Sequence, residues 1–266
     1  MQVLNDARID VRVDGSGDRA VVLIHGFPLT RAIWEAQSDA LARMSYVVRP
    51  DLRGAGRSSA PEGPYLMERL AADVAAVLDA LGIERTALVG HSMGGYVSLA
   101  FTRMYTERVT RLALVASRLR ADTEQEAASR HALAARIERE ASIEPVVEAY
   151  LPRLFAVATM TERPDLMERV RDVARTIGPA AAAAMLRGMA LRAPSEDIAE
   201  DLDVPVLVLA GGCDRVVGTE EARAVAARFK RGRLVLCPHS GHLPMVEEPE
   251  RVTEALVNWL AEPVSA

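Results

Sequence analysis

Short apolar runs that do not alternate with polar residues constrain the fold of this chain more than any other feature. The first lies at residues 21–24, and five more follow at 46–48, 87–89, 112–115, 206–209 and 234–236. A strand with one face in water alternates between apolar and polar residues, whereas a strand covered by helices on both faces is apolar throughout. These runs therefore predict the central strands of a parallel sheet buried between two layers of helices.

Between the apolar runs lie segments with the spacing of amphipathic helices. In residues 66–81 the apolar positions recur every three or four residues, and Gly82 follows as a helix stop. The last segment of this kind begins after Pro249 and ends near Leu260. Strands that alternate with helices of this length predict right-handed βαβ crossovers, so the expected fold class is α/β, with a doubly wound and mostly parallel sheet.

The N-terminal segment has a different pattern. Ile9, Val11 and Val13 alternate with charged residues, and a Gly-Ser-Gly-Asp turn follows at 15–18. Alternation of this kind is typical of a strand with one face in water, and such a turn commonly joins two antiparallel strands. We therefore predict an antiparallel hairpin at the start of the fold.

From about residue 120 to residue 194 the chain has no convincing strand, only polar and Ala-rich helical sequence. We predict three or four helices here, interrupted near Pro145, Pro152, Pro164 and Pro179. Long insertions at the edge of a sheet are commonly functional, which favours a helical cap over peripheral packing with no role at the site. The expected organisation is an α/β core, residues 1–119 and 195–266, with a helical cap inserted at 120–194.

Charge and hydropathy narrow the class of partner. The 266 residues carry a formal net charge of −5 with basic and acidic residues interspersed, which argues against a nucleic-acid partner. No apolar stretch approaches the roughly 18 residues of a membrane span, and the N-terminus lacks the features of a signal peptide. We expect a cytoplasmic protein that acts on a small molecule, with Cys213 and Cys237 as free thiols. A homo-oligomer is compatible with this composition.

One pentapeptide carries the strongest chemical signal. Gly90-His91-Ser92-Met93-Gly94 comes directly after an apolar run and before a helical segment at 95–104, the context in which a G-x-S-x-G pattern is informative. Side chains at positions 90 and 94 would collide with neighbouring elements in so sharp a turn. Ser92 is thus predicted to be a nucleophile at a helix N-terminus, where free N–H groups favour developing negative charge. The simpler alternative is that Ser92 only caps the helix.

A serine nucleophile needs a general base, and the base needs an orienting acid. Of the five histidines, His239 and His242 both follow the last predicted strand, at the edge of the sheet that holds Ser92. Asp214 follows the preceding strand and belongs to the same edge. The order Ser, Asp, His is the one expected after a strand–serine–helix turn of this kind. A loop-capping aspartate and a surface histidine are the alternatives.

Two backbone N–H groups are predicted to hold the oxyanion of the reaction. They belong to Phe27, in the loop His25-Gly26-Phe27-Pro28, and to Met93, directly after the serine. No cluster of His, Cys and carboxylates has metal-ligand spacing, so we expect no metal. We also expect no organic cofactor. Four side chains are expected as apolar neighbours of the substrate: Trp34, Tyr96, Phe155 and Leu243.

Together these residues resemble the α/β-hydrolase superfamily, and the match runs through most of the chain outside the predicted cap. Beyond the serine turn, it rests on the loop at 25–28, the turn at 51–58, Asp214 and the tripeptide Ser240-Gly241-His242, all in family order. The resemblance selects His242 over His239, and it implies that Arg53 and Arg57 in the turn are structural. It also implies a serine hydrolase without a cofactor.

Residues 27–95 are similar to 3-oxoadipate enol-lactonases and related esterases, which implies hydrolysis of a small carboxylic ester or lactone. An enol-lactonase must hold a substrate carboxylate, and four arginines are available for this: Arg118, Arg120, Arg130 and Arg153. Pro28 is similar to the oxyanion-loop proline of cofactor-free haloperoxidases. Perhydrolysis or C–C bond hydrolysis by the same triad is therefore an alternative, and a non-catalytic ligand-binding protein on this scaffold is a third.

Overall fold

The computed structural model describes residues 2–4 and 6–263. Seven strands form one sheet in the order β3-β5-β4-β6-β7-β8-β9, in which β3 is antiparallel to β5 and all other neighbours are parallel. The strands are β1 (Gln2–Leu4), β2 (Ala7–Ile9), β3 (Val11–Asp14), β4 (Ala20–Ile24), β5 (Tyr46–Pro50), β6 (Thr86–His91), β7 (Val109–Val115), β8 (Val206–Gly211) and β9 (Gly232–Cys237). Each of the six apolar runs lies within one of the strands β4 to β9, so the predicted parallel sheet is confirmed.

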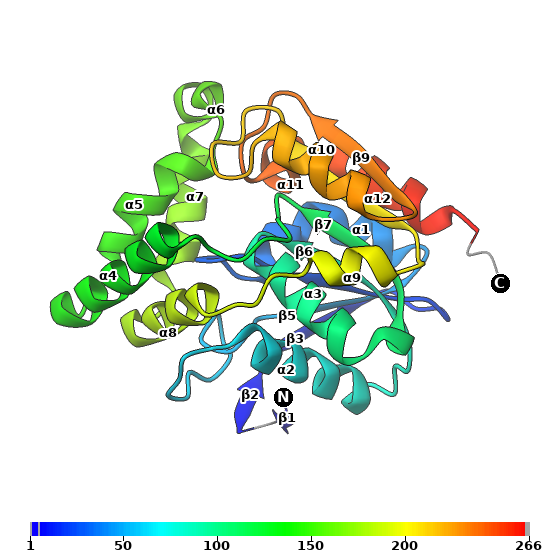
Figure 1. Ribbon diagram of the computed structural model, residues 1–266, viewed down its shortest axis with the longest axis horizontal. Helices are drawn as coiled ribbons and strands as arrows, with labels where there is room; N and C mark the ends of the chain where they lie inside the picture. Colours follow the sequence, from blue (N-terminus) through cyan, green and yellow to red (C-terminus); the bar gives the residue numbers. More distant parts are fainter. Residues whose placement is uncertain (1, 5, 264–266) are drawn as a thin grey trace.

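Helices cover both faces of the sheet, as Figure 1 shows. They are η1 (Arg31–Trp34), α1 (Glu35–Ala42), α2 (Met67–Ala80), α3 (Met93–Met104), η2 (Thr106–Arg108), α4 (Glu124–Glu140), α5 (Glu144–Leu154), α6 (Val157–Glu162), α7 (Pro164–Arg175), α8 (Pro179–Ala190), α9 (Glu196–Asp201), α10 (Thr219–Arg228), α11 (Pro244–Glu247) and α12 (Pro249–Ala261). Within β4, Val22 packs in the cluster that contains Leu70 of α2, whereas Val21 packs with Trp259 of α12. Alternate residues of one strand therefore enter two separate cores, which explains why the apolar runs show no alternation.

The prediction of an N-terminal hairpin is wrong in its pairing. Strand β3 is antiparallel, but it pairs with β5 and not with β4, the next strand along the chain. Strand β4 is apolar on both faces and occupies an interior position between β5 and β6. The partly exposed β3 takes the sheet edge, where only one neighbour is needed. The segment before it forms a separate hairpin of β1 and β2.

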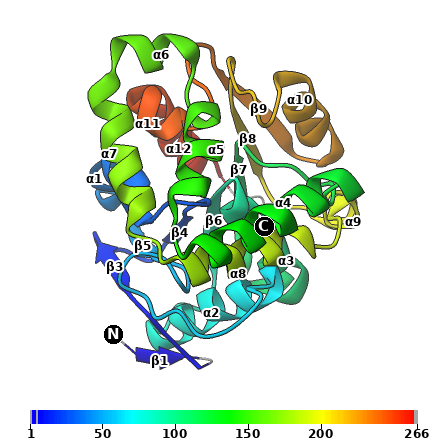
Figure 2. The ribbon, with the colours of Figure 1, turned by 90° about the vertical axis from the view of Figure 1, so that its left-hand side faces the viewer.

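The stretch between β7 and β8 contains five helices, α4 to α8, before the short α9, and not three or four. Pro145, Pro164 and Pro179 stand in the first turns of α5, α7 and α8, where the missing N–H costs nothing. Pro152 does not interrupt a helix but lies inside α5, two residues before its end. Figure 2 faces this side of the molecule, where α4 and α8 pack against each other.

The two cysteines do not form a disulfide. Cys213 is exposed and Cys237 is buried, and both are free thiols, as the sequence predicts. Across residues 2–4 and 6–263, no helix has both the length and the apolar character needed to span a membrane.

Candidate active site

Ser92 occupies the sharp turn between β6 and α3. Its backbone angles are φ 49° and ψ −112°, a conformation that L-residues rarely adopt. The turn is closely packed, because a Cβ at Gly90 would lie 2.3 Å from the carbonyl oxygen of Gly94, and one at Gly94 would lie 2.4 Å from that of Ile24. The Ser92 N–H donates to the Val115 carbonyl oxygen at 2.9 Å, which ties the turn to β7. The predicted collision of side chains at positions 90 and 94 with neighbouring elements is thus confirmed.

The structure brings Ser92, His242 and Asp214 into one hydrogen-bonded line. His242 lies in the loop between β9 and α11; its Nε2 is 2.9 Å from Ser92 Oγ, and its Nδ1 is 2.8 Å from Asp214 Oδ2. A carboxylate only accepts hydrogen bonds, so His242 Nδ1 carries the proton and Nε2 presents its lone pair to the serine hydroxyl. This is the arrangement that can remove a proton from Ser92.

Asp214 is held on both of its oxygens. Oδ2 accepts from His242, and Oδ1 accepts from the backbone N–H groups of Val216 and Val217 at 2.7 and 3.0 Å. Burial alone would raise the pKa of Asp214, but the contact with His242 and the two N–H groups lower it below its ordinary value. The carboxylate is therefore charged at neutral pH and able to stabilise an imidazolium.

The loop that carries His242 is fixed by residues that sequence reasoning missed. The His242 N–H donates to the Leu154 carbonyl oxygen at 2.9 Å, and the His242 carbonyl oxygen accepts from His91 Nε2 at 2.8 Å. The side chain of His91 thus turns to the His242 loop. Its fully buried ring lies 5.1 Å from the His242 ring. His239, the other histidine of this loop, is exposed to solvent.

The two predicted oxyanion donors lie in the loop after β4 and in the first turn of α3. Within the part of the chain that the structure describes, neither the Phe27 N–H nor the Met93 N–H donates to a protein acceptor. The Phe27–Pro28 peptide bond is cis. The loop is anchored by His25, whose Nε2 accepts from the Leu52 N–H at 3.0 Å and whose Nδ1 donates to the Gly26 carbonyl oxygen at 2.9 Å.

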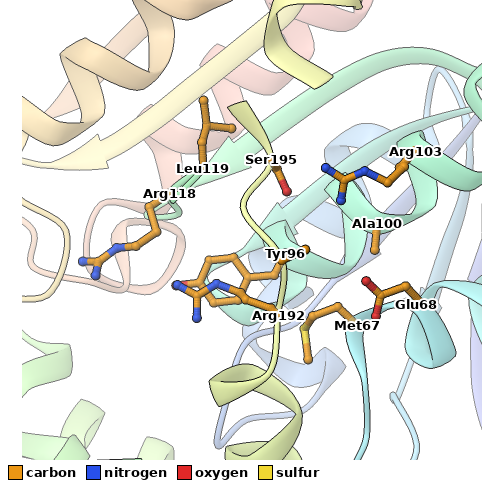
Figure 3. A pocket seen from close by; sticks show the side chains of 10 residues that line it. Met67, Glu68, Tyr96, Ala100, Arg103, Arg118, Leu119, Arg192 and Ser195 are labelled. Carbon is orange, nitrogen blue, oxygen red and sulfur yellow. The ribbon is translucent and has the colours of Figure 1, made fainter. Parts of the chain in front are cut away.

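Three of the four side chains predicted to meet the substrate are fully buried. Trp34, Phe155 and Leu243 all belong to the apolar cluster on the α12 side of the sheet. Tyr96, on α3, lines a small cavity with Arg118 and Arg192, and the Arg192 guanidinium lies 4.1 Å from the centre of its ring (Figure 3). One face of the Tyr96 ring is therefore occupied by a cation. Contact between these four residues and a substrate remains a prediction.

A cavity of about 460 Å³ lies between α4, α5 and the loop after β8. Arg130, Tyr150, Arg153 and Val216 are among its lining residues. Tyr150 packs edge-on against Phe27, with 5.2 Å between ring centres, and Val216 binds Asp214. The cavity thus adjoins both the candidate oxyanion loop and the loop of the acid.

The four arginines considered for a substrate carboxylate differ in their partners. Arg118 and Arg120 form ion pairs with Glu126 and Glu221. Arg130 binds Asp122 at 2.6 Å and the Tyr150 hydroxyl at 3.0 Å. Arg153 is exposed at the cavity, and among the described residues no carboxylate pairs with it. Arg153 is therefore the arginine best placed to bind an anionic ligand.

The structure also tests the view that the turn at 51–58 is structural. Arg53 is buried and binds Asp73 of α2 through two hydrogen bonds, at 2.6 and 2.7 Å. Arg57 is exposed.

No group of three or more His, Cys, Asp or Glu side chains with metal-binding geometry occurs among the residues described.

Comparisons with known proteins agree with this architecture. A family model described as alpha/beta hydrolase fold matches residues 19–249. A putative non-heme chloroperoxidase from a Synechocystis species is 30% identical over 271 aligned residues, which cover 96% of each protein. Two solved structures are also similar. An esterase from Thermogutta terrifontis has a TM-score of 0.92 at 38% identity, covering 95% of this chain and 92% of the esterase. An enol-lactonase from Burkholderia xenovorans has a TM-score of 0.90 at 28% identity, covering 98% and 99%.

Proposed function

This chain belongs to the alpha/beta hydrolase family, and we propose that it is a serine hydrolase that cleaves a small carboxylic ester or lactone through an acyl-enzyme on Ser92. The observation that carries the proposal is the hydrogen-bonded line from Asp214 through His242 to Ser92, with 2.8 and 2.9 Å between the bonded atoms. The similarity to an esterase and to an enol-lactonase over nearly the whole chain supports the substrate class.

In the first half of the proposed reaction, Ser92 Oγ attacks the carbonyl carbon while His242 Nε2 takes its proton. The negative charge moves to the carbonyl oxygen, where the N–H groups of Phe27 and Met93 are free to bind it. The C–O bond then breaks, and His242 returns the proton to the departing alkoxide oxygen. An ester releases its alcohol at this point, whereas a lactone keeps the new hydroxyl tethered.

In the second half, water replaces the alcohol. His242 takes a proton from the water as its oxygen attacks the acyl carbon, the same two N–H groups hold the oxyanion, and the Ser92 ester bond breaks with return of the proton to Oγ. The charged Asp214 stabilises the imidazolium in both halves. Because His242 acts twice, its position controls acylation and deacylation alike.

We further propose that the helices α4 to α8 act as a cap that selects the substrate. In support, α5 contributes Tyr150 and Arg153 to the cavity of about 460 Å³ beside the oxyanion loop. A volume in this range suits a small ligand. Arg153 lines this cavity and pairs with no carboxylate among the described residues, which favours a substrate that carries a carboxylate.

The similarity to a putative non-heme chloroperoxidase favours perhydrolysis as a second activity of the same site. In that reaction hydrogen peroxide replaces water as the acceptor of the acyl group, and a peracid replaces the carboxylic acid. The step needs no residue beyond those of hydrolysis.

A panel of substrates tests the proposal. We expect hydrolysis of short aryl esters or of carboxylate-bearing lactones, and covalent labelling of Ser92 by a fluorophosphonate that Ser92→Ala abolishes. A meta-cleavage product in the panel separates ester from C–C bond hydrolysis, and added peroxide tests peracid formation. Absence of both labelling and turnover would favour a ligand-binding protein instead.

A further inference from the structure

Glu247, in α11, is a partly buried carboxylate that the proposed reaction does not use. Its Oε1 accepts from the Gly241 N–H at 2.8 Å, in the residue directly before His242. Its Oε2 accepts from the Ala156 N–H at 2.9 Å and from the Thr159 hydroxyl at 2.6 Å, both at the start of α6. One side chain thus joins the His242 loop to the five-helix segment α4–α8.

The backbone contacts around Glu247 run between the same two segments. The His242 N–H donates to Leu154 at the end of α5, and a Cβ at Gly241 would lie 2.5 Å from the carbonyl carbon of Phe155. The Arg215 guanidinium donates to the carbonyl oxygens of Pro152 and Phe155. The junction between α5 and α6 therefore rests directly on the loops that carry the candidate base and acid.

A partly buried carboxylate at this position loses favourable hydration. Burial raises the pKa of Glu247 above its ordinary value, although its hydrogen bonds act in the opposite direction. An apolar side chain would avoid the loss of hydration, but it would leave the N–H groups of Gly241 and Ala156 without this acceptor. The carboxylate of Glu247 satisfies hydrogen-bond donors from the His242 loop and from the start of α6 at once, which an apolar side chain cannot do.

From this geometry we propose that Glu247 is a positioning residue, which sets the place of His242 by clamping its loop to the α5–α6 junction. The proposal rests on the function proposed above, since it gives His242 the role of general base. Through Glu247 the helical segment supports the catalytic geometry as well as bounding the substrate cavity. Thr159 is the partner of the clamp on the helical side.

Substitution of Glu247 tests the clamp. A displacement of about 1 Å in a catalytic group can cost on the order of 10²-fold in rate, so we expect Glu247→Ala to lower kcat by about 10- to 100-fold. KM should change by less than about threefold, since the substrate cavity is not altered. Acylation and deacylation, measured separately by burst kinetics, should slow together.

Glu247→Gln, which keeps one acceptor, should recover part of the rate. The matched control is Glu250→Gln, which changes an exposed carboxylate in the first turn of α12, and it should leave kcat unchanged.

A second pair of variants tests the clamp from the helical side, where folding is less at risk. Thr159→Val removes one hydrogen bond to Glu247, whereas Thr161→Val on the same helix removes a hydroxyl that binds only the Val157 carbonyl oxygen. We expect kcat to fall in Thr159→Val and not in Thr161→Val. Hydrogen exchange followed by mass spectrometry should show faster exchange at both 154–159 and 238–243 in Thr159→Val and Glu247→Ala.

Two results would overturn the proposal. One is a Glu247→Ala protein with a lower Tm but an unchanged kcat well below that Tm, which is the mark of a merely structural residue. The other is faster exchange confined to 154–159. If the unaltered protein neither turns over an ester nor labels at Ser92, the proposed function fails, and the exchange at 238–243 still decides whether Glu247 holds the loop.

Discussion

The side chain of His91 donates through Nε2 to the backbone carbonyl oxygen of His242 at 2.8 Å, so the residue before the candidate nucleophile supports the loop of the candidate base. A carbonyl oxygen only accepts, which places the proton of the neutral ring on Nε2. Burial is the main cause that lowers the pKa of His91, from 6.5 to about 3. His91 is therefore neutral throughout the pH range in which esters are normally assayed.

This lowered pKa predicts a pH dependence of stability. Between pH 3 and 6.5 the unfolded chain binds a proton at His91 that the folded chain does not, so the free energy of unfolding rises with pH over this interval. The stability is fully present above 6.5 and is lost as the pH falls. Urea unfolding from pH 4 to pH 7 should show a shallower dependence for His91→Ala than for the unaltered protein. Equal slopes would mean that His91 is not protected from protonation in the folded state.

The backbone strain at Ser92 predicts a difference between two inactive variants. At φ 49° and ψ −112°, alanine keeps the strain whereas glycine relieves most of it. Strain of this kind costs about 1–3 kcal/mol, partly offset by the greater freedom of glycine in the unfolded chain. We expect Ser92→Gly to be more stable to urea than Ser92→Ala by about 1 kcal/mol. Both should lose turnover by at least about 10⁴-fold. Activity retained in either variant would remove Ser92 from its proposed role.

Asp214 predicts an effect on rate without a large effect on binding. Asp214→Asn can donate to His242 Nδ1, which moves the imidazole proton to Nε2 and removes the lone pair that faces Ser92. In serine proteases the equivalent change costs about 10⁴-fold in kcat, and we expect a loss of similar order here. Steady-state kinetics on an aryl ester measure it. A loss of less than about tenfold would argue that another residue orients the base.

Arg153 predicts a preference for anionic substrates. Its guanidinium lines the cavity beside the candidate oxyanion loop and is paired with no carboxylate in the described part of the chain. Arg153→Gln should raise KM for a carboxylate-bearing ester by about 5- to 30-fold, equivalent to about 1–2 kcal/mol, and leave KM for the neutral analogue unchanged. Arg163→Gln, an exposed arginine of the same helical segment, is the control. Equal effects of Arg153→Gln on both substrates would exclude a specific contact with the anion.

The sequence predicted the parts of the molecule that depend on local pattern. Apolar runs without alternation located all six parallel strands, because a strand buried on both faces requires apolar residues at successive positions. The turn that carries Ser92 could also be predicted from the sequence, because Gly90 and Gly94 have no space for a side chain and the glycines are visible as a motif. The order of the strands then places Asp214 and His242 at the same edge of the sheet as Ser92.

Contacts between distant segments left no comparable signal. The pairing of β3 with β5 depends on which strand tolerates the sheet edge, and no turn motif encodes that choice. The role of His91 depends on one hydrogen bond to the backbone of His242, which is remote in sequence. That of Glu247 depends on hydrogen bonds that join two separate segments, at Gly241 and at Ala156 and Thr159. Helix α6 begins without a proline or a capping side chain, so the helical segment was predicted with too few helices. Sequence reasoning is least informative at the cavity that we propose for the substrate, because side chains from several segments meet there.

The last prediction concerns Arg53, which the family resemblance assigns to the scaffold and not to the substrate site. Arg53 binds Asp73 through two hydrogen bonds, and both side chains are at most 3% exposed. Removal of one partner leaves a buried charge, so Arg53→Met should lower the free energy of unfolding by about 3–5 kcal/mol.

The double variant Arg53→Met, Asp73→Leu should recover most of this loss, because it removes both charges. For the folded fraction, KM and kcat of the double variant should match those of the unaltered protein. Arg57→Gln, at an exposed position of the same turn, is the control and should change neither stability nor KM. A KM that rises in the double variant despite recovered stability would show that Arg53 contacts the substrate, because stability and binding would then depend on the guanidinium for separate reasons.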